Sequence, residues 1–190
     1  MIGFYGVVTT LFRRIFLTII SFHSPQLLLR SNNYGIRSVS MNIEIFVPGK
    51  SDIQSLYDIE CRAHTYPWSH HLLSSNFGQR YVNGAIRHQQ QVIGFYIADM
   101  LLDESTLMNI CIDPRWQRHG FGQLLLEHYL QQTAERGCIQ WWLEVRASNV
   151  AAQTLYEKKG FHQVGVRKNY YQNGNVSEDA LVMHKYGIDD

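Results

Sequence analysis

The sequence predicts an α+β domain in which a mixed, mostly antiparallel sheet is flanked by helices. Three observations lead to this prediction. After residue 41, segments of alternating apolar residues take turns with segments of helical spacing. Three strand-like segments between residues 81 and 112 are joined by links short enough for an antiparallel meander, and one strand–helix–strand unit follows late in the chain. The 190 residues, 45% of them apolar, can build one core.

Residues 1–40 differ in composition from the remainder, and we expect them to lie outside the fold. They contain four arginines and no Asp, Glu or Lys, whereas residues 41–190 carry more acidic than basic side chains. Arg13 and Arg14 interrupt the apolar stretch of this leader, which disfavours a membrane-spanning helix. An arginine-rich, acid-free leader fits a targeting segment, but no convincing cleavage site follows. We therefore expect translation to begin at Met41, with a removed targeting segment as the alternative.

Charge and cysteine content exclude several classes of protein. The formal net charge is +1, which argues against nucleic-acid binding through net charge. The three cysteines, Cys61, Cys111 and Cys138, are odd in number, widely spaced and without a CxxC pair, so neither a disulfide framework nor a structural zinc site is expected. His70 and His71 lack a ligand partner at helical spacing and a carboxylate cluster. No metal is therefore expected.

Turn and cap residues divide the first half of the domain into six elements. Pro48 and Gly49 end the first strand, and Asp52 can cap the first helix. Pro67 separates that helix from a short second one, which Ser69 can cap. The expected elements are a strand over residues 42–47, helices over 52–64 and 69–77, and strands over 81–88, 91–102 and 106–112.

The second half contains the strand–helix–strand unit. One long helix has Phe121, Leu125 and Tyr129 on one side and Gly137 just past its end. Asn149 can cap the helix that follows the next strand. The expected elements are a helix over residues 120–136, a strand over 139–145, a helix over 149–159 and closing strands over 161–168 and 180–184.

The loop before the long helix carries the most chemical content. Gly120 and Gly122 open the helix in the pattern Gln117-x-x-Gly120-x-Gly122. Free amides at a helix start, with no side chains in the way, can bind phosphate oxygens. The spacing is not the dinucleotide fingerprint, because Leu125 stands where a third glycine is needed, and it lacks the Gly-Lys-Ser/Thr of a P-loop. The loop is a candidate phosphate site, with a plain tight turn as the alternative.

With this loop the sequence resembles the GNAT family of acetyl-CoA-dependent N-acetyltransferases, whose pyrophosphate loop reads Gln/Arg-x-x-Gly-x-Gly/Ala. The bacterial branch that acetylates the N-terminal alanine of the eighteenth small-subunit ribosomal protein is similar in three further runs: Trp-Leu-Glu-Val-Arg-Ala-Ser-Asn at residues 142–149, Arg-Lys-Asn-Tyr-Tyr at 167–171 and His-x-x-Pro-Trp-Ser at 64–69. The resemblance covers residues 41–183. It implies the GNAT fold, acetyl-CoA as cosubstrate, a ribosomal protein N-terminus as partner, and a monomer in the cytoplasm.

The resemblance also implies the residues of the site. Glu144 would be the general base, and Tyr156 the acid that protonates the thiolate of CoA. The implied cofactor contacts are the strand end Ile110, Cys111 and Ile112, the loop residues Gln117, Arg118, His119, Gly120, Phe121, Gly122 and Gln123, and the helix residues Asn149 and Tyr156.

The chemistry itself explains why such residues are needed. Acyl transfer from a thioester to an amine requires a neutral amine, a stabilised oxyanion and a proton for the leaving thiolate. Strand alternation places Glu144 on the same face as Trp142, an aromatic neighbour that excludes water. From the residues alone, an ordinary exposed strand glutamate and a helix tyrosine with its ring in the core remain open.

Two other functions remain open at this stage. A GNAT enzyme that acetylates lysine or a small-molecule amine would share every cofactor residue. A non-catalytic acyl-CoA-binding module would need no acid and base, and the presence of both Glu144 and Tyr156 argues against it.

Overall fold

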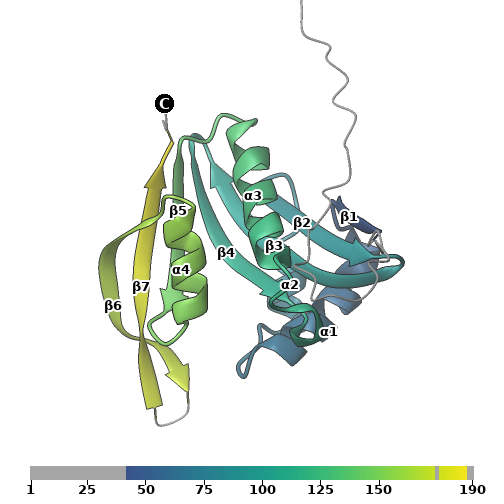
Figure 1. The fold of residues 1–190 in the computed structure, drawn as a ribbon, viewed down its shortest axis with the longest axis horizontal. Helices are drawn as coiled ribbons and strands as arrows, with labels where there is room; N and C mark the ends of the chain where they lie inside the picture. The colour runs from purple at the N-terminus through teal and green to yellow at the C-terminus, as the bar shows by residue number, and fades with distance from the viewer. Residues whose placement is uncertain (1–41, 174–175, 188–190) are drawn as a thin grey trace, which may run out of the picture. The chain divides into compact units, whose positions relative to one another are not determined.

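The computed structural model describes residues 42–173 and 176–187 (Figure 1). The expectations for residues 1–40 fall outside this part of the chain. In chain order the described elements are β1 (Ile43–Phe46), η1 (Lys50–Asp52), α1 (Ile53–Ala63), α2 (His70–Ser75), β2 (Tyr81–His88), β3 (Gln91–Leu101), β4 (Glu104–Ile112), η2 (Pro114–Trp116), α3 (Phe121–Ala134), β5 (Gln140–Arg146), α4 (Val150–Lys158), β6 (His162–Asn173) and β7 (Val176–Tyr186).

The strands of the described residues form one seven-stranded sheet in the order β1-β2-β3-β4-β5-β7-β6. Every neighbouring pair is antiparallel except β4 and β5, which are parallel and are connected through α3. The predicted meander of β2, β3 and β4 and the late strand–helix–strand unit are both present. The prediction of an α+β fold with a mixed, mostly antiparallel sheet is confirmed.

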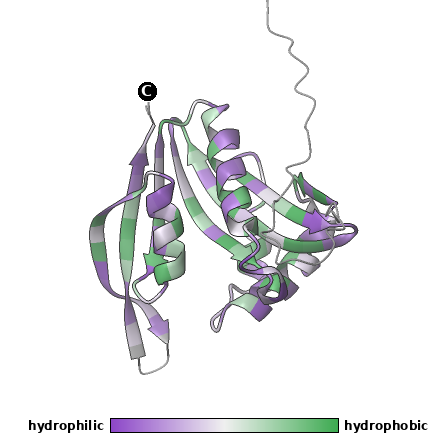
Figure 2. Cartoon of the chain, viewed as in Figure 1, coloured by the Kyte–Doolittle hydropathy of each residue, from purple (hydrophilic) through white to green (hydrophobic). Residues whose placement is uncertain are grey.

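Helices cover both faces of the sheet. On one face the buried residues of α3, such as Phe121, Leu125 and Tyr129, join a core cluster that continues to Tyr156 of α4. On the other face α1 and α2 pack on β2, β3 and β4 through a second, smaller cluster that includes Leu56. Figure 2 shows hydrophobic residues concentrated along the central strands, while the helices are banded in both colours, as expected for elements with one buried side.

The parallel pair β4 and β5 opens partway along its length. Its ladder runs from the pair Glu104–Gln140 to the pair Leu107–Leu143 and ends there. Beyond it, β4 continues to Ile112 without further pairing to β5, and Figure 1 shows the two strands diverging. The split leaves room for a cavity between two strands in the middle of the sheet.

The closing hairpin is longer than the sequence pattern predicts. We expected strands over residues 161–168 and 180–184, whereas β6 and β7 both extend further. A bulge between Arg167 and Tyr171 shifts the register, and the pairing then continues to the end of β6. Hydrophobic alternation could not predict this arm, because its residues are mostly polar.

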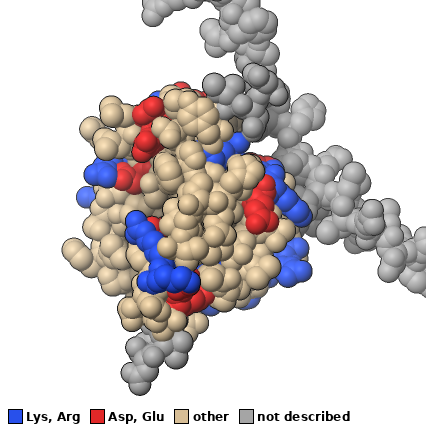
Figure 3. Space-filling view, turned by 90° about the vertical axis from the view of Figure 1, so that its left-hand side faces the viewer, with Lys and Arg blue, Asp and Glu red and all other residues tan. Residues whose placement is uncertain are grey.

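The surface supplies two further observations. No helix among the described residues is long and apolar enough to cross a membrane. On the face shown in Figure 3, basic and acidic side chains are interspersed and most of the surface is uncharged.

Candidate active site

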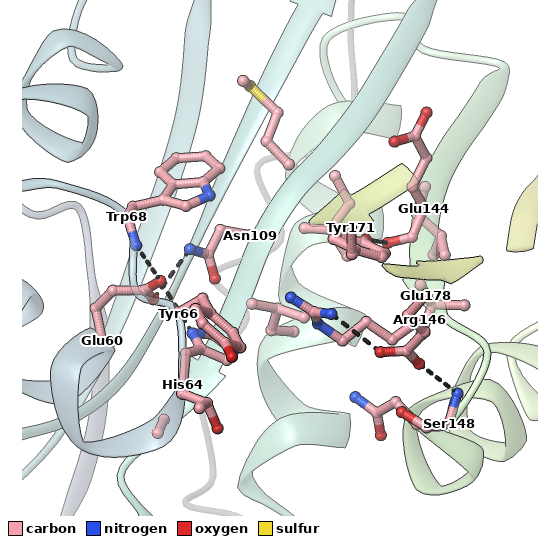
Figure 4. A pocket seen from close by; sticks show the side chains of 18 of the residues that line it. Glu60, His64, Tyr66, Trp68, Asn109, Glu144, Arg146, Ser148, Tyr171 and Glu178 are labelled. Carbon is pink, nitrogen blue, oxygen red and sulfur yellow. Dashed lines mark hydrogen bonds and ion pairs between the residues drawn. The ribbon is translucent and has the colours of Figure 1, made fainter. Parts of the chain in front are cut away.

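A cavity lies where β4 and β5 separate. Its volume is about 550 Å³, and its lining comes from α1, the connection between α1 and α2, β4, β5, α4 with the turn before it, β6 and β7. Figure 4 shows two walls facing each other across it: Glu60, His64, Tyr66 and Trp68 on one side, and side chains of β5, β6 and β7 on the other. Segments far apart in the sequence therefore meet at this one site.

Glu144 lies in the wall formed by β5. The strand buries Trp141, Leu143 and Val145, and its alternation turns Glu144 to the opposite face. Glu144 lines the cavity and also a smaller hollow that Trp142 lines, so the two residues share a face as predicted.

The immediate partners of Glu144 come from β6. Its Oε1 lies 2.9 Å from Nη1 of Arg167, and 25% of its side chain is exposed. The hydrogen bond to Glu144 raises the pKa of the Tyr170 hydroxyl. Trp142 instead stacks on His184, with ring centroids 4.0 Å apart. The charged partner of Glu144 is therefore an arginine that the sequence did not indicate.

Tyr156 reaches the cavity from α4. Its side chain is buried, with its ring edge-on to Phe161 at 6.0 Å, and burial raises the pKa of its hydroxyl above the ordinary value. The group is therefore protonated at neutral pH, which is the state an acid needs before it donates.

Asn149 and Ile110 also line the cavity, whereas Cys111 and Ile112 do not. Asn149 caps α4 as predicted, since its side chain accepts a hydrogen bond from the amide of Ala152 at 3.2 Å. The side chain of Cys111 packs in the cluster under α1, and burial raises the pKa of its thiol. Ile112 packs against α3 in the other cluster. These two residues can serve the site only through their backbone.

The loop before α3 presents backbone at a helix start. Gly120 is the N-cap of α3 with a φ of 84°, and no side chain caps this helix. The first amides of a helix have no acceptor within it. A Cβ at Gly120 would meet nothing within 4 Å, so the glycine is needed here for its positive φ.

The other residues of this loop use their side chains elsewhere. Gln117 donates to the carbonyl of Ile112 at 3.0 Å, and Gln123 donates to Glu127 at 2.9 Å. Phe121 is buried in the core. The ring of His119 lies 2.7 Å from the carbonyl of Gln117, and Arg118 is exposed with a φ of 67°. Besides the exposed side chains of Arg118 and His119, this loop offers a ligand its own backbone amides and the uncapped first amides of α3.

Two carboxylates that the sequence did not indicate, Glu60 and Glu178, hold the two walls of the cavity in place through hydrogen bonds and an ion pair. On one wall the buried Glu60 accepts hydrogen bonds from Asn109 and from the amide of Trp68. On the other, Glu178 pairs with Arg146 at 3.0 Å. Helical spacing does place Glu60 on the apolar side of α1, and a lone carboxylate at such a position is the signal that could have found it.

A second brace joins β5, β6 and β7. The guanidinium of Arg146 lies over the ring of Tyr171 at 4.1 Å, and Glu178 also accepts from the amide of Ser148 at 2.8 Å. The hydroxyl of Tyr171 lies 3.5 Å from the carbonyl oxygen of Glu144. No local sequence pattern could have indicated this set, because its members come from three elements.

One group of potential metal ligands occurs among the described residues. The ligand atoms of Glu60, His64 and Cys111 lie within 4.8 Å of one another. Both carboxylate oxygens of Glu60 already accept hydrogen bonds, and the thiol of Cys111 is buried. The predicted helix histidines His70 and His71 are exposed and are not part of this group.

Comparison with known proteins agrees with this geometry. Residues 53–161 match the model of the acetyltransferase (GNAT) family. The chain belongs to the GNAT family of acetyltransferases. It is therefore an acyltransferase that depends on acetyl-CoA, the acyl donor of this family.

Two similar proteins are both named [ribosomal protein bS18]-alanine N-acetyltransferase. That of Escherichia coli (strain K12) is 45% identical over 133 residues, which cover 70% of this chain and 90% of the relative. That of Haemophilus influenzae is 48% identical over 136 residues, covering 71% and 92%. The crystal structure of the ribosomal-protein-S18-alanine N-acetyltransferase from E. coli superposes with a TM-score of 0.73 at 42% identity, covering 76% of this chain and 93% of that one.

Proposed function

We propose that this enzyme transfers the acetyl group of acetyl-CoA to the α-amino group of the N-terminal alanine of ribosomal protein bS18. The names of the relatives that are 45% and 48% identical support this substrate. The observation that carries the proposal is the meeting of Glu144, Tyr156 and Asn149 in one cavity between the separated strands. The reaction needs a base, which the carboxylate of Glu144 can supply, and an acid, which the protonated phenol of Tyr156 can supply. It also needs space between the strands for the thioester.

In this proposal the backbone binds acetyl-CoA. The amides from Arg118 to Gln123 receive the pyrophosphate, because the helix start is uncapped and positive in potential. The backbone of Ile110, Cys111 and Ile112 pairs with the pantetheine arm and the acetyl group along the open edge of β4. Asn149 keeps α4, and with it Tyr156, in place.

The chemical step uses one base and one acid. Glu144 takes a proton from the α-ammonium group, whose reference pKa of about 7.7–8.0 is far below the 10.4 of lysine. The neutral amine attacks the thioester carbonyl, a C–N bond forms, and the C–S bond breaks as the intermediate collapses. Tyr156 gives its proton to the departing thiolate and is reprotonated by the second proton that the attacking nitrogen loses, while the proton held by Glu144 leaves to solvent, so that both groups are restored. Products are the acetylated N-terminus and CoA.

A substrate panel tests the proposal. The enzyme is incubated with acetyl-CoA and either the N-terminal peptide of bS18 or the same peptide blocked at its N-terminus with a lysine inside; acetylation is read by mass spectrometry and CoA release by a thiol assay. Acetylation of the free alanine alone supports the proposal. Acetylation of the blocked peptide at lysine would identify a lysine acetyltransferase, and acetyl-CoA binding without thiol release would indicate a binding module.

The catalytic unit in this proposal is residues 41–190, acting as a monomer in the cytoplasm, where ribosomal proteins are made. The family match at residues 53–161 lies within this range and supports it. N-terminal sequencing of protein from its native source should find a start at Met41 or Asn42. A mature chain that retains Met1 would contradict this boundary, and a processed end between residues 30 and 40 would favour an organelle.

A further inference from the structure

We propose that Glu60 is a positioning residue for the polypeptide substrate. Its carboxylate fixes the connection between α1 and α2 against β4, and so holds the cavity wall that lies across from Glu144 (Figure 4). The inference rests on the proposed function, because it assumes that a peptide N-terminus enters this cavity.

Glu60 is buried as deeply as the apolar residues around it. Only 1% of the residue is exposed, on the side of α1 that also buries Leu56 and Ile59. A carboxylate at such a position is strongly disfavoured unless hydrogen bonds replace its water. Three donors do so: the amide of Trp68, Nδ2 of Asn109 and Nδ1 of His64, each at 3.0 Å.

These donors keep Glu60 ionised. Burial alone would raise the pKa of the carboxyl group, but the hydrogen bonds from His64, Trp68 and Asn109 together hold that pKa below its ordinary value. The charge in turn strengthens each of the three hydrogen bonds. Glu60 is thus a rigid joint between three segments of the chain.

The position of the donors shows what the joint holds. His64 follows the last residue of α1, and Trp68 precedes Ser69, the N-cap of α2, so Glu60 grips both ends of the short connection. Between them, Thr65 and Tyr66 line the cavity, and both residues are exposed. Their own packing therefore does not fix the connection.

The third donor lies on the opposite side of the joint. Asn109 is in β4 beyond the end of its ladder with β5, next to Ile110, which lines the cavity. Glu60 therefore sets the distance between the connection and the strand where the acetyl group is expected. This distance decides whether a peptide N-terminus is held in reach of the thioester.

Packing of α1 does not depend on this carboxylate. Ile53, Leu56 and Ile59 fix the helix on the sheet through the cluster that they share with Phe95 and Ile97. Loss of Glu60 should therefore release the connection and leave the helix in place.

The test compares Glu60→Leu with the conservative Glu60→Gln. Leucine fills the space without accepting hydrogen bonds, whereas glutamine still offers its amide oxygen to Trp68 and can bond Asn109 if that amide turns over. We expect Glu60→Leu to raise KM for the peptide at least tenfold, with kcat within threefold and KM for acetyl-CoA within twofold of the unchanged enzyme. Glu60→Gln should restore most of the peptide KM.

A matched control separates positioning from loss of stability. Tyr129→Phe removes a buried hydroxyl that donates to Ser105 at 2.9 Å in the core under α3, away from the cavity lining. It should lower the melting temperature and leave the peptide KM unchanged. If Tyr129→Phe raises the peptide KM as Glu60→Leu does, or if Glu60→Leu raises KM for acetyl-CoA equally, the positioning role is overturned.

Hydrogen exchange gives a readout that needs no substrate. The Trp68 amide should exchange slowly in the unchanged protein and at least tenfold faster in Glu60→Leu, with Tyr129→Phe leaving it slow. If the Trp68 amide exchanges equally fast in Glu60→Leu and in the unchanged protein, Glu60 does not hold the connection between α1 and α2. If the unchanged enzyme acetylates no alanine peptide, the proposed function fails on its own, while the exchange of Trp68 still decides whether Glu60 holds the connection.

Discussion

The cofactor side and the substrate side of the proposed site are built differently, and the loop before α3, which belongs to the cofactor side, does not itself line the cavity. On the cofactor side, the loop before α3 and the open edge of β4 present backbone groups, while side chains such as Gln117, Phe121 and Ile112 are engaged elsewhere or buried. On the substrate side, contacts between side chains form the site. Glu60 accepts a hydrogen bond from Asn109, 49 residues away in the sequence, and Glu178 pairs with Arg146, 32 residues away. A backbone site suits a cofactor common to a family, whereas a site of side chains can change with the substrate.

The largest effect should come from the residues placed between the two halves. Glu144→Gln and Tyr156→Phe should each lower kcat by about 10²–10⁴-fold, because each removes one proton-transfer group. Affinity for acetyl-CoA, measured by calorimetry, should remain within threefold in both variants. Glu104→Gln, which changes an exposed glutamate on the neighbouring strand, is the matched control and should keep full turnover. Near-normal turnover in Glu144→Gln would show that another group removes the proton.

The next largest effect should be a loss of stability at Asp113, which connects the end of α1 with the segment before the cofactor loop. Asp113 is fully buried and pairs with Arg115, beside the cofactor loop, and with Arg62 at the end of α1. Asp113→Asn should lower the free energy of unfolding at pH 7 by about 1.5–3 kcal/mol, since it weakens charged hydrogen bonds to a buried group. Urea denaturation measures this loss, and Asp58→Asn on the exposed side of α1 is the control.

The same pair predicts a pH dependence with a definite sign. Hydrogen bonds from Arg115, opposed by burial and assisted by Arg62, lower the pKa of Asp113. The stabilisation is therefore complete above the unfolded pKa of about 3.9 and is lost as pH falls below it toward the folded pKa. The gap in stability between the unchanged protein and Asp113→Asn should narrow by about 1 kcal/mol between pH 5 and pH 3. A gap that stays constant would mean that the pKa of Asp113 is the same in the folded and the unfolded protein.

The backbone half is tested at Gly120. Its φ of 84° is strained for any side chain, so Gly120→Val should move the first amides of α3 and weaken acetyl-CoA binding about tenfold. Gly78→Val is the matched control, because a Cβ there also meets nothing within 4 Å and Gly78 has no positive φ. Unchanged calorimetric affinity in Gly120→Val would remove this loop from the cofactor site. The peptide KM at saturating acetyl-CoA should change less than the acetyl-CoA affinity.

The same contrast explains what the sequence could predict. The fold, the loop at Gly120 and the cap at Asn149 depend on local spacing, so alternation, helical period and turn residues were sufficient. Glu144 and Tyr156 came from resemblance, since a strand glutamate and a helix tyrosine carry no signal of their own. The pairing of Glu144 with Arg167 depends on a bulge in β6, and the polar hairpin arm has no apolar period. Contacts between side chains far apart in the sequence were beyond such patterns.

The smallest effect should arise at Glu178, where the substrate half touches the cofactor half. One oxygen of Glu178 accepts from Arg146 and the other from the amide of Ser148, which directly precedes Asn149. Glu178→Gln keeps one acceptor and turns a donor toward the other partner, so Arg146 should loosen over the ring of Tyr171, in the cavity wall.

We expect Glu178→Gln to raise the peptide KM about threefold, the size of a partly exposed charged hydrogen bond, and to leave KM for acetyl-CoA unchanged. Steady-state kinetics with each substrate varied in turn measures both constants, and Glu157→Gln on the exposed side of α4 serves as the control. A rise in KM for acetyl-CoA equal to that for the peptide would mean that Ser148 transmits the change to Asn149 and α4. The two halves would then share this residue, and the division between a backbone site and a side-chain site would hold only on the Glu60 wall.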